Sequence, residues 1–148
     1  MFRGTFTVKA DEKGRIKLPA LVKDRLDKEY GKGATYFVTS PTGDIVHIYP
    51  DSVWERFESI LSQAPSFDET KKRFLFWASH YGGEATMDDQ GRLLIPAKLR
   101  DQAGMKGEVM LAWESNHIEV RSQARYEAAL EEMKLRPEDF QYLAKLGI

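Results

Sequence analysis

The chain contains two copies of one short motif, in which an acidic turn leads to an arginine and then to a Pro-Ala pair. The five matched pairs, each separated by 77 positions, are Asp11/Asp88, Gly14/Gly91, Arg15/Arg92, Pro19/Pro96 and Ala20/Ala97. Five ungapped matches exceed chance, so we infer that one unit has been duplicated. The two halves should then share a local structure, and a site that is used twice suits a repetitive or two-fold partner such as nucleic acid.

The pattern around each motif predicts the same order of elements, namely hairpin, helix and hairpin. In the first copy these elements are 5–9, 15–18, a helix from 19 to about 31, 35–39 and 45–49. In the second copy they are 84–87, 92–95, 96–103, 108–112 and 118–121. The last hairpins match at a shorter offset of 72, as in Val46/Ile118 and Ile48/Val120. The predicted fold class is therefore mainly β with α.

The segment from Asp11 to Gly14 is predicted to form a type I turn closed by a glycine in the left-handed region, which is a common hairpin connection. Asp11 and Arg15 then flank the turn. An aspartate in that place can hold the guanidinium by a bidentate, charge-assisted contact. The same arrangement is predicted for Asp88 and Arg92, so both copies would present an arginine that is already oriented.

Two helices are predicted between the copies. Ser52 and Ser66 each open a capping-box pattern, the second of them before a helix that runs towards His80. That second helix is apolar almost all the way round, and it includes Phe76 and Trp77. Two interpretations remain open for it, a well-buried core helix or a subunit interface.

Charge is segregated along the chain, although the formal net charge is only −1. Residues 1–33 carry nine Lys or Arg against five Asp or Glu, and residues 71–106 carry seven against four. The compensating acid lies in residues 34–70 and 107–148. Both basic blocks contain the repeated motif, and clustered basic charge is what a nucleic-acid partner requires.

The composition argues against several other classes of protein. Hydrophobic residues make up 42% of the chain and charged residues 30%, which is typical of a folded globular domain. Cysteine is absent, and the three histidines (His47, His80 and His117) lack metal-ligand spacing, so we expect no metal and no cofactor. Because no secretory signal or membrane-spanning apolar run is apparent, we expect a cytoplasmic location and no membrane partner.

Arg15 and Arg92 are the candidate DNA-reading residues. The major groove of double-stranded DNA admits a two-stranded ribbon, and a guanidinium can make two hydrogen bonds to a guanine edge. Asp11 and Asp88 would position these arginines. Other basic residues near the motifs would contact phosphates and contribute affinity and salt dependence more than specificity: Arg3, Lys9, Lys13, Lys17, Lys23, Lys98 and Arg100.

Three other interpretations compete with DNA binding. Each Asp–Arg pair could be a surface ion pair that only stabilises its hairpin. The chain could be an enzyme that binds a divalent metal through the carboxylates of Asp11, Glu12, Asp88 and Asp89, although no histidine or glycine-rich phosphate loop supports this. It could also be a ring-forming assembly or adaptor protein, with the aromatic helix before His80 as its partner surface.

The residues of both motifs resemble those of the MraZ family. The similar segments are MFRG from residue 1, DEKGR from residue 11, DDQGR from residue 88, LLIPAKLRDQAG from residue 93 and GEVML from residue 107. The resemblance spans residues 1–125. Two Asp-x-x-x-Arg motifs in one chain make it specific, because the related AbrB and antitoxin-type regulators usually carry one unit per chain and dimerise.

This resemblance implies a swapped-hairpin, AbrB-like β-barrel made of two internal repeats with flanking helices, assembled into a ring-shaped homo-oligomer. It implies a transcriptional regulator, typically a repressor, of the bacterial division and cell-wall gene cluster. Such a regulator binds short direct repeats in promoter DNA and is associated with the nucleoid. From the residue pattern itself, residues 1–64 would be the first repeat, 65–81 a connecting helix, 82–133 the second repeat and 134–148 a docked C-terminal helical extension.

The resemblance also carries over the DNA-binding residues of the family. These are Asp11, Arg15, Asp88 and Arg92, and both copies are intact. The copies differ nearby, since Lys13 and Lys17 in the first stand where the second has Gln90 and Leu94. The first copy is the more basic, so we expect it to dominate binding.

Overall fold

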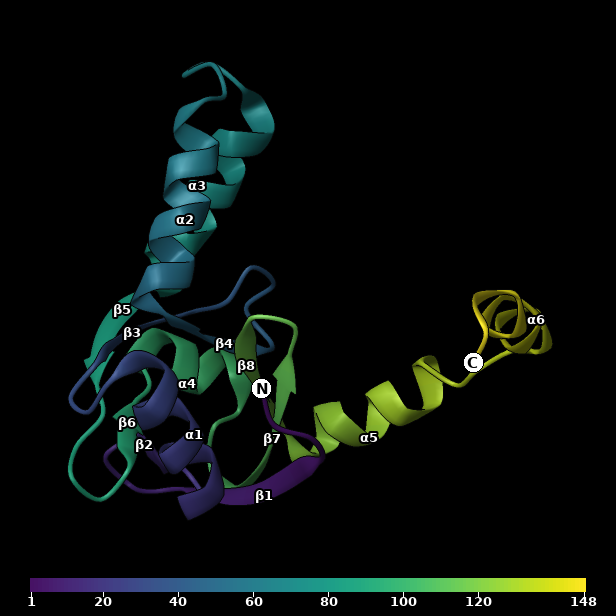
Figure 1. The fold of residues 1–148 in the computed structure, drawn as a ribbon. Helices are drawn as coiled ribbons and strands as arrows, with labels where there is room; N and C mark the ends of the chain where they lie inside the picture. Colours follow the sequence, from purple (N-terminus) through teal and green to yellow (C-terminus); the bar gives the residue numbers. More distant parts are fainter.

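Eight antiparallel strands form one curved sheet, which Figure 1 shows with the helices around it. The computed structural model describes every residue from 1 to 148. The strands are β1 (Thr5–Ala10), β2 (Arg15–Lys17), β3 (Thr35–Thr39), β4 (Val46–Pro50), β5 (Gly83–Thr86), β6 (Arg92–Leu94), β7 (Gly107–Glu114) and β8 (His117–Ser122). The helices are α1 (Ala20–Tyr30), α2 (Asp51–Ser62), α3 (Glu69–Tyr81), α4 (Ala97–Ala103), α5 (Gln123–Glu132) and α6 (Pro137–Leu146).

The sheet is nearly closed into a barrel. Its strand order is β5-β3-β4-β8-β7-β1-β2-β6, and the two edge strands, β5 and β6, contact each other. Strands of the two repeats interleave, because β1 pairs with β7, β2 with β6 and β3 with β5. Each repeat therefore covers strand edges that the other would leave unpaired, which would otherwise invite aggregation. This arrangement confirms the predicted swapped-hairpin barrel.

A pseudo-two-fold axis relates the two repeats. Ile16 pairs with Leu93 across β2 and β6, and these two residues are repeat equivalents, 77 positions apart. His47 pairs with Glu119 across β4 and β8, and they are equivalents at the second offset of 72. A residue that pairs with its own equivalent must lie beside the symmetry axis. The axis therefore crosses the barrel wall at these two pairs.

Equivalent apolar residues of both repeats fill the barrel. Side chains alternate between the two faces of a strand, so Ile16 and Leu93 are fully buried while Arg15 and Arg92 lie on the outer face. Helices α1 and α4 begin at Ala20 and Ala97, one residue later than predicted, so each repeated proline is the N-cap and not the first helical residue. They add equivalent buried residues to the core, namely Val22 and Leu26 from α1 and Leu99 and Ala103 from α4.

Helices α2 and α3 form a pair that projects from the barrel (Figure 1). Aromatic packing holds its base, since the ring of Trp54 lies 5.2 Å from Tyr49 and 5.8 Å from Phe74, centroid to centroid. Farther along α3 the side chains of Phe76 and Trp77 are 68% and 43% exposed. The interpretation of α3 as a buried core helix is therefore wrong for the single chain, because no other element covers its outer side.

The start of each of these two helices differs from the prediction. Helix α2 begins at Asp51, directly after Pro50, without a side-chain cap, so Ser52 does not open a capping box. Helix α3 is capped by Asp68, whose carboxylate accepts a hydrogen bond of 2.8 Å from the amide of Lys71. Ser66 was predicted for that role, but aspartate is an equally good cap and stands at the position where the chain turns into the helix.

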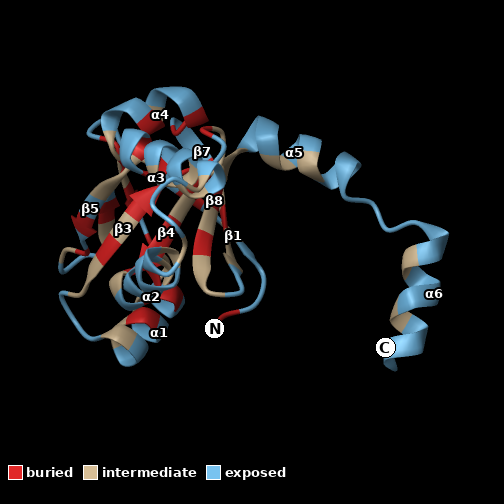
Figure 2. Ribbon diagram, turned by 90° about the horizontal axis from the view of Figure 1, so that it is seen from above, coloured by how far each residue is buried: buried red, intermediate tan, exposed pale blue.

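The C-terminal helices form an arm that leaves the barrel (Figures 1 and 2). Helix α5 contacts β7 and β8, whereas α6 makes no comparable contact with any element, and neither helix has a buried residue. The prediction that residues 134–148 dock on the rest of the chain is therefore wrong, because the arm carries α6 away from the barrel (Figure 2). None of the helices combines the length and the hydropathy that crossing a bilayer requires.

Candidate nucleic-acid interface

The first repeated motif forms a tight turn around one carboxylate. Gly14 donates a backbone hydrogen bond of 3.0 Å to the carbonyl of Asp11, and its φ of +81° is the left-handed conformation predicted for the glycine that closes the turn. The Oδ1 atom of Asp11 accepts hydrogen bonds from the amides of Lys13 (3.0 Å) and Arg15 (2.8 Å). Its Oδ2 atom accepts a bond of 2.8 Å from Nε of Arg15. One aspartate therefore fixes both the turn and the guanidinium.

The second motif repeats these contacts. The Oδ1 atom of Asp88 accepts hydrogen bonds of 2.9 Å from the amides of Gln90 and Arg92. Its Oδ2 atom accepts a bond of 2.7 Å from Nε of Arg92. Gly91 closes the turn with a φ of +78°. The two sites are thus copies in geometry as well as in sequence.

The contact between each aspartate and its arginine differs from the predicted bidentate contact. Only one carboxylate oxygen meets the guanidinium, and it meets Nε, because the other oxygen is occupied by turn amides. Neither Arg15 nor Arg92 makes a protein hydrogen bond through its terminal Nη atoms. Those atoms form the part of the guanidinium that can bind a guanine edge or a phosphate. The side chain is therefore held at its stem while its tip stays free.

These contacts keep both carboxylates ionised. The backbone amide of Arg15 is the main cause that lowers the pKa of Asp11 below its usual 3.8, and the guanidinium lowers it further. The amide of Arg92 does the same for the pKa of Asp88. Each carboxylate is therefore charged at neutral pH.

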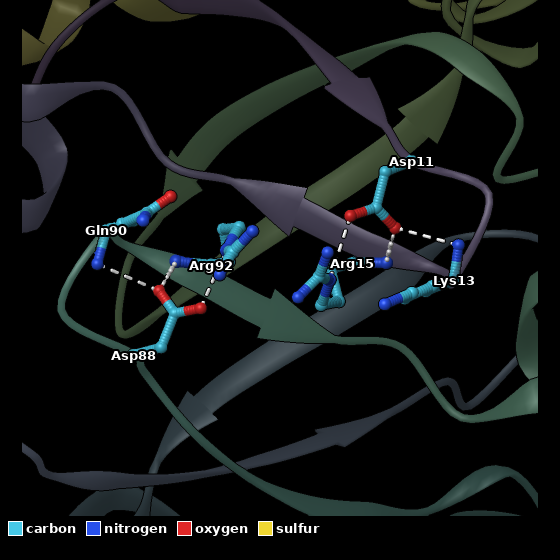
Figure 3. A network of polar contacts seen from close by, with 6 residues as sticks. All are labelled: Asp11, Lys13, Arg15, Asp88, Gln90 and Arg92. Carbon is cyan, nitrogen blue, oxygen red and sulfur yellow. Dashed lines mark hydrogen bonds and ion pairs between the residues drawn. The ribbon is translucent and has the colours of Figure 1, made fainter.

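The fold brings the two arginines together. Strands β2 and β6 pair antiparallel, so Arg15 lies opposite Leu94 and Lys17 lies opposite Arg92. Arg15 and Arg92 are then diagonal neighbours on one face, about 7–8 Å apart at the backbone. Figure 3 shows the two Asp–Arg pairs on either side of this strand pair. The outer face here carries three cations and the 50% exposed side chain of Leu94.

Each turn is also locked to the other repeat by hydrogen bonds. The amide of Leu18 donates to the carbonyl of Gly91 at 2.8 Å, and the amide of Ile95 donates to the carbonyl of Gly14 at 2.9 Å. These two bonds are repeat equivalents of each other. The separation of the arginines is therefore set by backbone hydrogen bonds rather than by mobile side chains.

Two of the basic residues predicted to meet phosphates also have contacts within the chain. The side chain of Arg100, on α4, packs directly against Gly14, and its Nε is buried without a hydrogen-bond partner. The equivalent Lys23, on α1, lies against Gly91 and forms an ion pair of 2.7 Å with Asp27. Lys23 and Arg100 occupy matching positions 77 residues apart in the two repeats, and this match is the sequence feature that indicates a shared packing role.

The other predicted basic residues lie at different distances from the motifs. Lys13 is exposed in the first turn, and Lys17 is exposed on the outer face of β2. Arg3 precedes β1, whereas the turn follows it, so the length of the strand separates Arg3 from Arg15. Lys9 lies on β1 opposite Glu108. Only Lys13 and Lys17 join the paired arginines directly.

The carboxylates predicted for a metal-dependent enzyme do not converge on a common point. Asp11 and Asp88 are each occupied by their own turn and arginine, and Figure 3 shows them on opposite sides of the strand pair.

The arrangement of two of the histidines differs from what their spacing in the sequence predicts. Although their spacing in sequence suggests no ligand set, His47 and His117 meet beside Glu119 on the outer face of β4 and β8.

Comparison with known proteins identifies the family of the chain. The model of the family described as "MraZ protein, putative antitoxin-like" matches residues 1–77 and 83–141. A protein named Transcriptional regulator MraZ from Acidobacterium capsulatum is 42% identical over 151 residues, and the match covers 100% of both chains. One of the same name from Koribacter versatilis is 36% identical over 148 residues, again across 100% of both chains. The chain belongs to the MraZ family.

Proposed function

We propose that this protein is a DNA-binding transcriptional regulator whose two Asp-x-x-x-Arg turns contact double-stranded DNA. The observation that carries the proposal is the pair of diagonal arginines, each held at Nε with its Nη atoms free. A merely structural ion pair would need neither the free Nη atoms nor the neighbouring Lys17. The names of the similar proteins support a regulator and not an enzyme.

The paired strands β2 and β6 suit the major groove, which admits a two-stranded ribbon. Arg15 and Arg92 would contact base edges, and Lys13 and Lys17 would contact phosphates. Since the first repeat adds both lysines, it would contribute more of the affinity. Pre-orientation by Asp11 and Asp88 reduces the side-chain entropy that each arginine loses on binding.

The cellular role that we propose follows the resemblance of the two motifs to the MraZ family. The protein would act, as a repressor, on the bacterial division and cell-wall gene cluster by binding short direct repeats in its promoter. It would work in the cytoplasm, in association with the nucleoid. Repeated DNA sites suit a regulator that presents several copies of the same hairpin pair, since linked weak contacts gain strength from high effective concentration.

We further propose a ring-shaped homo-oligomer, because the chain has two different exposed apolar surfaces. The α2–α3 surface consists of Ile60, Phe67, Phe76 and Trp77, which are 43–75% exposed. The arm surface consists of Leu130, Met133, Leu135, Phe140 and Leu146, which are 57–76% exposed. Apolar exposure of this extent marks interaction surfaces. Contact between two unlike surfaces of neighbouring copies generates a ring when the rotation closes.

The test is binding of the purified protein to the DNA upstream of its own coding sequence, with scrambled DNA of equal length for comparison, over a range of salt concentrations. We expect preferential binding with a steep salt dependence, because phosphate contacts release counterions. Arg15→Ala should abolish the preference and leave the oligomer intact, and Arg92→Ala should weaken it less. Arg73→Ala is the matched control, since Arg73 is an exposed arginine on α3 with its own ion pair to Glu69.

Normal promoter binding by Arg15→Ala would refute the proposed role of the hairpins. Equal loss in Arg73→Ala would show that binding reflects general positive charge. If the wild-type protein showed neither preference nor salt dependence, the chain would be an assembly or adaptor protein, and the repeated motif would serve only to build the barrel.

A further inference from the structure

A cluster of two histidines and one glutamate lies at one end of the pseudo-two-fold axis, where the axis crosses the barrel wall opposite strands β2 and β6. His47 on β4 and Glu119 on β8 are register partners, and His117 precedes Glu119 by two residues on the same face of β8. The side chains are 14%, 12% and 12% exposed for His47, His117 and Glu119. The cluster is therefore sheltered but still accessible to a small ion.

The donor atoms of this cluster converge. Nε2 of His117 lies 2.9 Å from Oε2 of Glu119, and Nε2 of His47 lies 3.6 Å from the same oxygen. One donor atom from each of the three residues lies within 4.8 Å of the others. Zinc binds imidazole nitrogen and carboxylate oxygen at about 2.0–2.2 Å, which puts neighbouring ligand atoms of a tetrahedral site about 3.3 Å apart. These two distances bracket that value. Because the planes of the two imidazole rings are only 18° apart, one ring must turn before both Nε2 atoms can face a single ion.

The opposite nitrogen of each imidazole has its own partner. Nδ1 of His47 lies 3.0 Å from the hydroxyl of Tyr49, and Nδ1 of His117 lies 2.8 Å from Oδ1 of Asn116. Metal-binding histidines almost always make such a second contact, which fixes the orientation of the ring and the tautomer. Here both contacts leave Nε2 directed at Glu119. The rings themselves stack, with centroids 4.6 Å apart.

The remaining carboxylate oxygen is held by a cation. Nη2 of Arg121 lies 2.9 Å from Oε1 of Glu119, so Oε2 is the oxygen left for the cluster.

We propose that His47, His117 and Glu119 form a binding site for a divalent transition-metal ion of the zinc type, with a fourth position open to water. Two imidazoles and one carboxylate form a ligand set that suits Zn²⁺. The ion would join β4 of the first repeat to β8 of the second. It would stabilise the barrel at the end of the axis away from Arg15 and Arg92, so DNA contacts would not depend on it directly.

The test is titration of the untagged, chelator-treated full-length protein with Zn²⁺ by calorimetry, and with Co²⁺ by visible absorption. We expect one ion per chain and a Co²⁺ spectrum typical of tetrahedral coordination. His117→Gln and Glu119→Gln should each weaken binding at least tenfold. His80→Gln is the matched control, because His80 is the only other histidine and is exposed on α3.

A second measurement on the wild-type protein avoids any effect of the substitutions on folding. In nitrogen-detected NMR of the imidazoles, Zn²⁺ should shift the Nε2 signals of His47 and His117 and leave His80 unchanged. The proposal would be overturned if the wild-type protein bound no ion, if only His80 responded, or if His117→Gln bound Zn²⁺ as tightly as the wild-type protein.

Discussion

At the scale of single residues, two aspartates determine where two arginines point. Asp11 and Asp88 each use one oxygen for backbone amides and the other for a guanidinium. An exposed ion pair of this kind adds little to the stability of the fold. Its contribution to binding would be larger, because a pre-oriented arginine loses less freedom when it meets DNA.

Asp88→Asn separates this positioning effect from charge. Removal of an acid beside a DNA-binding surface should strengthen binding if only net charge mattered. We expect weaker binding instead, roughly tenfold, because Arg92 loses its charged partner. Asp89→Asn is the control, since Asp89 lies in the same turn and makes no hydrogen bond or ion pair with Arg92. Gel-shift titrations of both variants check this, and stronger binding in both would exclude positioning.

The pKa of Asp11 should depend only partly on its arginine. The largest cause of its lowered pKa is the backbone amide of Arg15, which Arg15→Ala retains. We therefore expect the variant to raise the pKa of Asp11 while leaving it below 3.8. Carboxyl carbon NMR during a pH titration measures this, with Asp88 as the internal control. A return of Asp11 to 3.8 or above would show that the guanidinium dominates.

The same lowered pKa values predict how stability changes with pH. Because the pKa of Asp11 and Asp88 is lower in the folded than in the unfolded chain, their stabilising contribution is complete above about 3.8 and is lost as pH falls through the folded value. The free energy of unfolding of Asp11→Asn should therefore vary less with pH below 3.8 than that of the wild-type protein.

At the scale of elements, each hairpin is supported by the other repeat. The turn of the first repeat packs against α4 of the second, through Gly14 and Arg100, and the turn of the second packs against α1 of the first, through Gly91 and Lys23. The backbone bonds from Leu18 and Ile95 complete this exchange. Neither turn could keep its position without the opposite repeat.

Gly14→Ala tests the close packing of turn and helix. A side chain at Gly14 would carry a φ of +81° and would also overlap Arg100. Gly33→Ala is the control, because Gly33 has a φ of +71° with no atom near its would-be Cβ. We expect the control to lose about 1–2 kcal/mol of unfolding free energy and Gly14→Ala about 1–3 kcal/mol more. Urea unfolding measures both, and equal losses would show that Arg100 moves away freely.

At the scale of the whole molecule, the two exposed apolar surfaces lie on elements that leave the barrel. The α2–α3 pair and the α5–α6 arm project in different directions (Figure 1). Helix α2 is covered by α3, whereas the repeat-equivalent α5 has no such cover from its own chain. The repeats are therefore alike in the barrel and unlike outside it, which provides the two unlike surfaces of a ring.

Trp77→Ser should reduce the size of the assembly. The side chain of Trp77 is 43% exposed in the α2–α3 surface, and its loss removes apolar area from the proposed contact between copies. Leu21→Ser is the control, because Leu21 is 50% exposed on α1, outside both surfaces. Light scattering after size exclusion measures the mass. Binding to DNA with several repeats should fall, and binding to a single repeat should not. An unchanged mass would remove α3 from the interface.

The sequence by itself determined the local structure of this protein. The duplication, the two type I turns, the helices after Pro19 and Pro96, and the candidate residues Asp11, Arg15, Asp88 and Arg92 all follow from short patterns, because turns and helix starts depend on neighbouring residues. The barrel was predicted only from the resemblance to the MraZ family. The cap of α3 does not follow from the sequence, because Asp68 and Ser66 are both good caps and only the path of the chain selects Asp68.

The tertiary structure alone decided which distant residues meet. Pairing of β2 with β6 places Arg15 beside Arg92, and pairing of β4 with β8 places His47 beside Glu119. Such contacts depend on the register between strands that are more than 70 residues apart, which no local pattern encodes. The exposure of α3 and α6 could not be predicted from the sequence for a related reason. An apolar helix has the same sequence pattern whether its own chain or a second copy covers it.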